Sequence, residues 1–181
     1  EQDLQTPGTP GDVADMTAWQ ALLSRSGVGP DTTIVVYSGL NNLLATLAFW
    51  LLKGHGHGPV RLLDGDKQKW LDEGRPTTSE APAIPPARYP PPLPDTKLRA
   101  RFEDVLASLG QPNTLLVDAR SAEMYTGQDT AGMARAGHIP GAVNLAAHRE
   151  LHPDGAFAAW RVPTVNADGT FRPADELETL L

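Results

Sequence analysis

The chain has 181 residues, 40% of them apolar and 20% charged, and this balance is typical of a soluble globular protein with one domain or two small ones. A net charge of −7 without a basic stripe argues against a nucleic-acid partner, and no apolar run is long enough to span a membrane. The absence of cysteine excludes disulfides and thiolate metal sites, and the absence of a visible signal peptide leads us to expect a cytoplasmic location.

Apolar periodicity in the first half of the chain predicts helices that alternate with strands. Met16, Trp19 and Leu23 are spaced for one face of a helix, and residues 33–37 are rich in the β-branched side chains that favour strands. The expected elements are a helix at 15–26, a strand at 33–37, a helix at 43–53, a strand at 60–63 and a helix at 66–73. The second of these helices is apolar nearly all round, so we expect it to be buried.

A proline-rich segment follows at 75–95. Eight prolines fall between positions 76 and 94. This composition favours an extended, semi-rigid arm.

The second half of the chain opens with a helical pattern that runs through Leu98 and Leu106. Residues 115–117 form a short apolar run that predicts a buried parallel strand. Asp118 and Arg120 follow it, at the carboxyl end where open α/β sheets place ligand sites. Next, Ser121 is the expected N-cap of a short helix that reaches Tyr125.

Residues 137–142 read Gly-His-Ile-Pro-Gly-Ala, and two glycines and a proline around one apolar residue are typical of a rigid turn. We expect a strand at 142–145 after this turn. The segment 146–161 is expected to be irregular. A turn is expected at 167–171, and a last helix is expected to have Pro173 at its first position.

In this order and spacing, the Asp-x-Arg strand end, the short helix with its aromatic residue and the Gly-His-Ile-Pro-Gly-Ala turn resemble the rhodanese family of sulfurtransferases. The first half of the chain also resembles that family, where it is similar to the second half of the first domain in tandem thiosulfate sulfurtransferases. The residues that carry this second resemblance are Tyr37, Asn41, Asn42, Phe49, Trp50 and the run 61–76.

The resemblance implies a rhodanese-like α/β fold, with a parallel sheet flanked by helices, present here as two incomplete domains. Residues 1–75 are similar to the C-terminal half of a first, non-catalytic domain, and 76–97 to the proline-rich linker. Residues 98–181 are similar to the N-terminal half of a second domain without its active loop. The alternative is one permuted rhodanese-like domain, in which the strand near Val35 lies beside the strand near Val117.

The resemblance implies that the parent protein moves sulfane sulfur from a small anionic donor, thiosulfate or 3-mercaptopyruvate, to a thiophile such as cyanide. In the family a loop cysteine carries this sulfur as a persulfide. Because the chain has no cysteine, we assign no catalytic residue within it and expect it to be inactive alone. We expect no cofactor. The alternative function is a non-catalytic rhodanese-like binding module.

Three residues are expected on the wall of the substrate pocket. Asp118 and Arg120 match the family's Asp-x-Arg, and Arg135 could meet an anionic substrate. The alternatives are a salt bridge that orders the strand end for the first two, since such pairs are commonly structural, and a solvated surface side chain for Arg135. His138 is expected to be a hydrogen-bonded turn histidine, because no second catalytic group is placed to work with it.

Ser38 occupies the position at which active rhodaneses carry cysteine, but a hydroxyl nucleophile needs an activating base. We therefore expect the loop of Ser38, Gly39, Asn41 and Asn42 to be non-catalytic, with the two asparagines capping the following helix.

His55 and His57 alternate with glycines. We expect a flexible turn here and no metal site, because structural metal sites use about four ligands.

Overall fold

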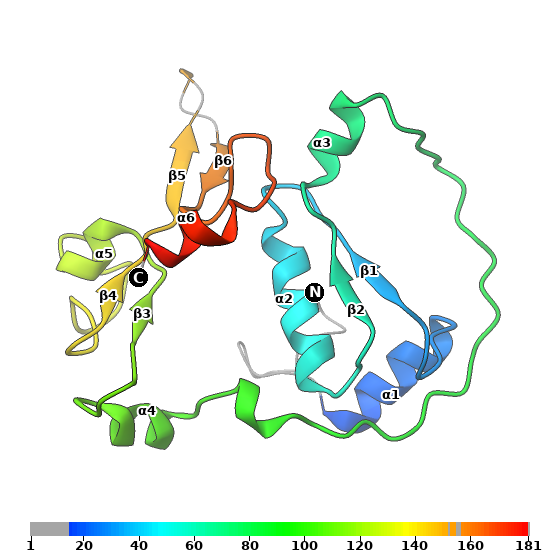
Figure 1. The fold of residues 1–181 in the computed structure, drawn as a ribbon, viewed down its shortest axis with the longest axis horizontal. Coiled ribbons are helices and arrows are strands. Elements are labelled where there is room, and N and C mark those ends of the chain that lie inside the picture. The colour runs from blue at the N-terminus through cyan, green and yellow to red at the C-terminus, as the bar shows by residue number, and fades with distance from the viewer. Residues whose placement is uncertain (1–14, 152, 155–156, 181) are drawn as a thin grey trace. The chain divides into compact units, whose positions relative to one another are not determined.

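The computed structural model describes residues 15–151, 153–154 and 157–180 (Figure 1). Within these ranges, no helix is both long enough and apolar enough to cross a membrane. The elements are α1 (Met16–Arg25), β1 (Ile34–Val36), α2 (Leu43–Gly54), β2 (Val60–Leu62), α3 (Lys67–Asp72), the 3₁₀ helix η2 (Thr96–Leu98), α4 (Phe102–Ser108), β3 (Val117–Asp118), α5 (Ala122–Thr126), β4 (Val143–Asn144), β5 (His148–Leu151), β6 (Phe157–Arg161) and α6 (Ala174–Glu178).

The chain divides into two compact units. The first contains the described residues up to Leu63 together with Trp70–Arg99, and the second contains Asp64–Lys69 and the described residues from Ala100 onward.

The sheet of the first unit has two parallel strands. β1 pairs with β2 in the register Ile34 with Val60 and Val36 with Leu62, and α2 forms the crossover and packs against both strands. Parallel strands require such a crossover, which is usually a helix. The helix–strand–helix–strand order predicted for this half is therefore confirmed, with element ends shifted by one or two residues.

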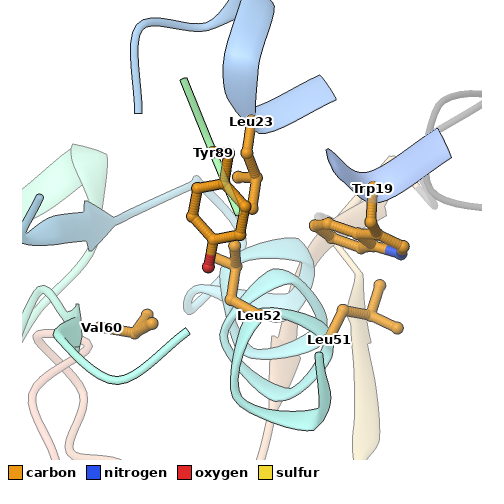
Figure 2. Packing of buried hydrophobic residues seen from close by; sticks show 6 residues of the cluster. All are labelled: Trp19, Leu23, Leu51, Leu52, Val60 and Tyr89. Atoms are coloured by element: carbon orange, nitrogen blue, oxygen red, sulfur yellow. The ribbon is translucent and has the colours of Figure 1, made fainter. Parts of the chain in front are cut away.

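The core of the first unit lies between α1, the C-terminal half of α2 and the proline-rich segment. Trp19 and Leu23 are four residues apart on α1 and so lie on one face of it. Each buried side chain of this size stabilises the folded unit by about 1.5–3 kcal/mol. Figure 2 shows the six side chains gathered around α2, and they are Trp19, Leu23, Leu51, Leu52, Val60 and Tyr89.

The proline-rich segment has no helix or strand before η2, yet it is part of this core. Tyr89 is buried, its N–H donates to Ser24 Oγ at 3.2 Å, and its carbonyl accepts from Gln20 Nε2 at 2.8 Å. Nearby, Gly27 has a φ of +72°, and a Cβ there would lie 2.3 Å from Ile84 Cγ2, so glycine is required where the segment crosses the end of α1. The function of 76–97 as a link between two half-domains stays a prediction.

The prediction that α2 is buried all round is wrong for one of its faces. Ala45, Leu51 and Leu52 are buried, whereas Leu44 is 56% exposed and Leu47 is also exposed. The reason is that α1, the proline-rich segment and a sheet of only two strands cover one side of the helix among the described residues.

The second unit also contains a two-stranded parallel sheet. β3 pairs with β4, Val117 with Val143 and Asp118 with Asn144, and α5 lies within the connection between them. The predicted strand is thus present, but the prediction that it is buried is wrong, since Val117 is 45% exposed. Among the described residues, no ladder joins β1 to β3, and each belongs to its own sheet.

The segment expected to be irregular instead forms a hairpin. β5 and β6 are antiparallel, with His148 opposite Arg161 and a register shift at Glu150 and Leu151. The sequence Pro-Asp-Gly at 153–155 is a turn signal, and apolar periodicity alone does not reveal it.

The end of the second unit is a turn followed by a short helix. Val165 bridges to Phe171. The prediction that Pro173 is the first residue of the last helix is wrong by one position, because Pro173 is the N-cap of α6. Asp64 Oδ1 accepts a hydrogen bond from the Phe171 N–H at 2.8 Å, and Lys69 forms an ion pair with Asp168 at 2.9 Å. The segment 64–69 is therefore fixed to this turn.

Candidate functional site

Asp118 and Arg120 form a two-pronged ion pair at the carboxyl end of β3. Arg120 Nε donates to Asp118 Oδ1 at 2.9 Å, and Nη2 donates to Oδ2 at 2.5 Å. The Arg120 backbone N–H also donates to Oδ1, at 2.9 Å. Hydrogen bonding to Arg120 holds the pKa of the Asp118 carboxyl below its ordinary value. The structural salt bridge considered from the sequence is thus observed.

The same arginine connects the strand end to the Gly-His-Ile-Pro-Gly-Ala turn. Nη2 of Arg120 donates to the Gly137 carbonyl at 2.9 Å, and Asn144 of β4 donates to the carbonyls of Asp118 and Arg120, both at 2.9 Å. Nη1 has no hydrogen-bond partner within the described ranges, and the side chain is one third exposed. This arrangement leaves one N–H₂ group of a fixed guanidinium available to an anion.

His138 is the hydrogen-bonded turn histidine that the sequence predicts. Its Nδ1 lies 2.8 Å from the Tyr125 carbonyl, to which it donates, and its ring stacks on the Tyr125 ring at 3.7 Å between centroids. The Tyr125 hydroxyl donates to the Ala142 carbonyl at 2.8 Å. The aromatic residue of α5 therefore holds both ends of the turn.

Arg135 is exposed on the segment between α5 and β4. No hydrogen bond joins Arg135 to Arg120 in the part of the chain that the structure describes, so its place on a substrate pocket stays a prediction.

The Ser38 loop of the first unit is closed by its own hydrogen bonds. The Ser38 hydroxyl donates to the Gly39 carbonyl at 3.0 Å and accepts from the Ala45 N–H of α2 at 3.3 Å. None of these partners is a base that could activate the hydroxyl.

The expectation that Asn42 caps α2 through its side chain is wrong. Asn42 occupies the N-cap position in the left-handed conformation, with a φ of +59°. Its Oδ1 accepts from the Ser38 N–H at 2.8 Å and its Nδ2 donates to the Leu63 carbonyl at 2.9 Å. The serine hydroxyl caps the helix instead, because the asparagine side chain is used to join the loop to the end of β2.

An apolar groove of about 400 Å³ adjoins this loop on the face of β1 and α2 that the first unit leaves uncovered. Val35 and Tyr37 are 53% and 60% exposed there. The residues that line the groove are Val35, Val36, Tyr37, Ser38, Leu44, Ala45, Leu47 and Ala48.

The prediction of a flexible turn at His55 and His57 is wrong, because both side chains are buried and hydrogen-bonded. His57 is 1% exposed, with Nε2 2.8 Å from the Thr32 carbonyl and Nδ1 2.8 Å from the Tyr89 hydroxyl. His55 Nδ1 lies 2.8 Å from the Leu51 carbonyl. No group of three or more potential metal ligands occurs among the described residues.

Comparison with known families finds one sequence model that part of the chain matches. Residues 102–175 match the sequence model of the rhodanese-like domain. This range includes the Asp118–Arg120 pair, α5 and the turn that Arg120 contacts.

Individual relatives extend the likeness over most of the chain. The sulfur carrier protein TtuD of Thermus thermophilus is 42% identical over 169 residues, which is 88% of this chain and 54% of the relative. A putative thiosulfate sulfurtransferase of Mycobacterium tuberculosis is 37% identical over 162 residues, 86% of this chain and 57% of the relative. The chain thus spans little more than half the length of these relatives. Together these findings show that the chain is similar to rhodanese-family proteins over most of its length.

Solved structures show the same fold. The anaerobic ergothioneine biosynthesis enzyme of Chlorobium limicola superposes with a TM-score of 0.79 at 21% identity, over 98% of this chain and 44% of that one. YnjE superposes with a TM-score of 0.78 at 24% identity, over 99% of this chain and 42% of that one. At these identities the likeness concerns the fold alone.

Proposed function

We propose that this chain is part of a tandem-rhodanese sulfurtransferase, with the domain boundaries given above and the nucleophilic cysteine supplied by residues outside these 181. The parent would take sulfane sulfur from thiosulfate or 3-mercaptopyruvate and pass it to a thiophile such as cyanide. The observation that carries the proposal is the Asp118–Arg120 pair, bonded to Gly137 at the carboxyl end of β3. The relatives' names and the chain's share of their length support it.

In this proposal the chain builds one wall of the pocket. A cysteine thiolate attacks the outer sulfur of thiosulfate, the S–S bond breaks, sulfite leaves with the electron pair, and a persulfide remains. Cyanide then attacks the outer sulfur of the persulfide, and thiocyanate and the thiolate are released. The free N–H₂ edge of Arg120, with Arg135, would attract the donor's negative charge. Asp118 would hold the guanidinium in place.

The second candidate is a non-catalytic rhodanese-like binding module. Two observations favour it, since the chain contains no thiol and the Ser38 hydroxyl is bonded on both sides. In that case the groove beside Ser38 or the Arg120 edge would be a binding surface.

Thiocyanate formation from thiosulfate and cyanide tests the proposal. We expect the purified chain to react at the blank rate, and the complete protein encoded by its gene to react well above it. Replacing the complete protein's cysteine by serine should abolish the reaction. A complete protein at the blank rate would favour the binding module. A rate above blank from the purified chain, retained after repurification, would contradict the assignment of catalysis to a cysteine elsewhere.

A further inference from the structure

A second cavity, of about 350 Å³, lies in the second unit between the end of β6 and the turn before α6. Its volume falls within the range of about 300–1,000 Å³ that is usual for small-molecule sites. The wall combines cationic, polar and apolar residues, and the main ones are Arg161, Arg172, Asn166, Val162, Pro163 and Val165.

The turn before α6 holds two of the polar lining residues in place. The Asn166 N–H donates to the Thr170 carbonyl at 2.8 Å, and its Nδ2 donates to the Phe171 carbonyl at 3.2 Å. The Arg172 N–H donates to the Thr164 carbonyl at 3.0 Å. The backbone that carries Asn166 and Arg172 is thus braced from within the unit.

The Arg172 guanidinium is incompletely satisfied. Its Nε is buried and has no hydrogen-bond partner among the described residues. Its Nη1 lies 3.8 Å from Glu176 Oε2, too far for a hydrogen bond, and 40% of the side chain is exposed. A buried donor without a partner is costly and calls for an explanation. Turning this guanidinium toward the cavity would break no hydrogen bond.

The groups that line the cavity suit an anion. Arg161 and Arg172 both lie in its wall, and Oε2 of Glu176 is 3.8 Å from Nη1 of Arg172. The carboxylate of Asp168, in the turn before α6, accepts hydrogen bonds from Lys69 and from the hydroxyl of Thr170. Hydrogen bonding to these two groups holds the pKa of Asp168 below its ordinary value, so it stays ionised and paired.

We propose that this cavity binds a small organic anion. The Nε and Nη edge of Arg172 binds the oxyanion, as guanidinium groups bind phosphates and carboxylates through two parallel hydrogen bonds. The body of the ligand lies against Val162, Pro163 and Val165. The volume holds about ten non-hydrogen atoms at roughly 30 Å³ each, more than an inorganic ion fills. This inference does not depend on the proposed sulfur transfer.

Titration of the whole chain with phenyl phosphate, followed by the NMR signals of the arginine Nε–H groups, tests this site. Two control compounds separate its parts: inorganic phosphate has the oxyanion without the ring, and phenol has the ring without the phosphate. We expect a saturable shift of the Arg172 Nε–H signal, with phenyl phosphate binding about fivefold or more tightly than phosphate because the ring is buried. Phenol should leave this signal unchanged. Equal binding of phenol and phenyl phosphate, or no saturable shift, would overturn the proposal.

Three variants locate the site. Arg172→Gln should weaken phenyl phosphate binding about tenfold, or about 1.4 kcal/mol. Arg88→Gln, which replaces an exposed arginine of the first unit, should bind as the wild type does. Glu176→Gln should strengthen binding, because it removes the competing carboxylate. Wild-type affinity in Arg172→Gln, or an equal loss in Arg88→Gln, contradicts the proposal. Should Arg172→Gln fail to fold, the Glu176→Gln affinity decides, and a decrease there counts against the site.

Discussion

The hydroxyl of Tyr89, in the proline-rich segment, meets Nδ1 of the buried His57 at 2.8 Å. Because Nε2 of His57 faces the Thr32 carbonyl and so carries the proton, Nδ1 is the acceptor and the tyrosine donates. Burial also raises the pKa of the Tyr89 hydroxyl above its ordinary value, which keeps the donor protonated. This hydrogen bond thus ties an irregular segment to the turn that precedes β2.

Removing this hydroxyl should destabilise the first unit. Tyr89→Phe leaves Nδ1 of His57 buried without a donor, so we expect a loss of about 1–3 kcal/mol in the free energy of unfolding. Urea unfolding followed by tryptophan fluorescence, to which the buried Trp19 contributes, measures it. Tyr37→Phe is the matched control, since Tyr37 is 60% exposed, and should change little. Equal stability of the two variants would show that the Tyr89–His57 bond is not stabilising.

The Asp118–Arg120 pair should make stability depend on pH in the acid range. The folded-state pKa of Asp118 is lowered, so its stabilisation is present above the ordinary carboxyl pKa of about 3.9 and is lost as the pH falls below it. Asp118→Asn should therefore unfold more easily than the wild type at pH 7, by about 1.5–3 kcal/mol. That difference should shrink in acid. Asp31→Asn, at an exposed loop position, is the control, and a pH-independent difference for Asp118→Asn would argue against the ion pair.

The hydrogen bond from Phe171 to Asp64 should be visible in amide exchange. Asp64→Ala removes the acceptor, so the Phe171 N–H should exchange with solvent faster. The control is Asp129→Ala. In the wild type the Asp129 carboxylate accepts from the Ala131 N–H, so this variant should change the exchange of the Ala131 amide and not that of Phe171. Unchanged protection of Phe171 in Asp64→Ala would mean that another group protects this amide.

A thiol at position 38 should not create an efficient sulfur carrier. Ser38→Cys places sulfur where the hydroxyl now accepts from Ala45 and donates to Gly39, and no base lies among its partners. We expect thiocyanate formation close to the blank rate, and little gain of mass by one sulfur atom after incubation with thiosulfate. Rapid and complete persulfide formation would show that the loop is already shaped for catalysis.

Features encoded locally could be predicted from the sequence. The Asp-x-Arg strand end, the N-cap by Ser121 and the turn at 137–142 depend on neighbouring residues, and all are present. The sequence also predicted strands where β3 and β4 lie, but not that these two strands pair with each other.

Features set by distant contacts could not be predicted in this way. The burial of His55 and His57 depends on Trp19, Thr32 and Tyr89, and no local pattern encodes these contacts. Helix periodicity likewise indicates which faces of α2 are apolar, but not which of them the rest of the unit covers.

The place of Tyr89 in the first unit has a consequence for synthesis on the ribosome. The core partners Trp19, Leu52 and Val60 all leave the exit tunnel before Tyr89 does. At about 5–20 residues per second, the chain spends seconds with this core open after β2 has been made. During that interval His57 lacks the tyrosine, so the nascent first unit should gain its full resistance to protease only once the proline-rich segment has emerged.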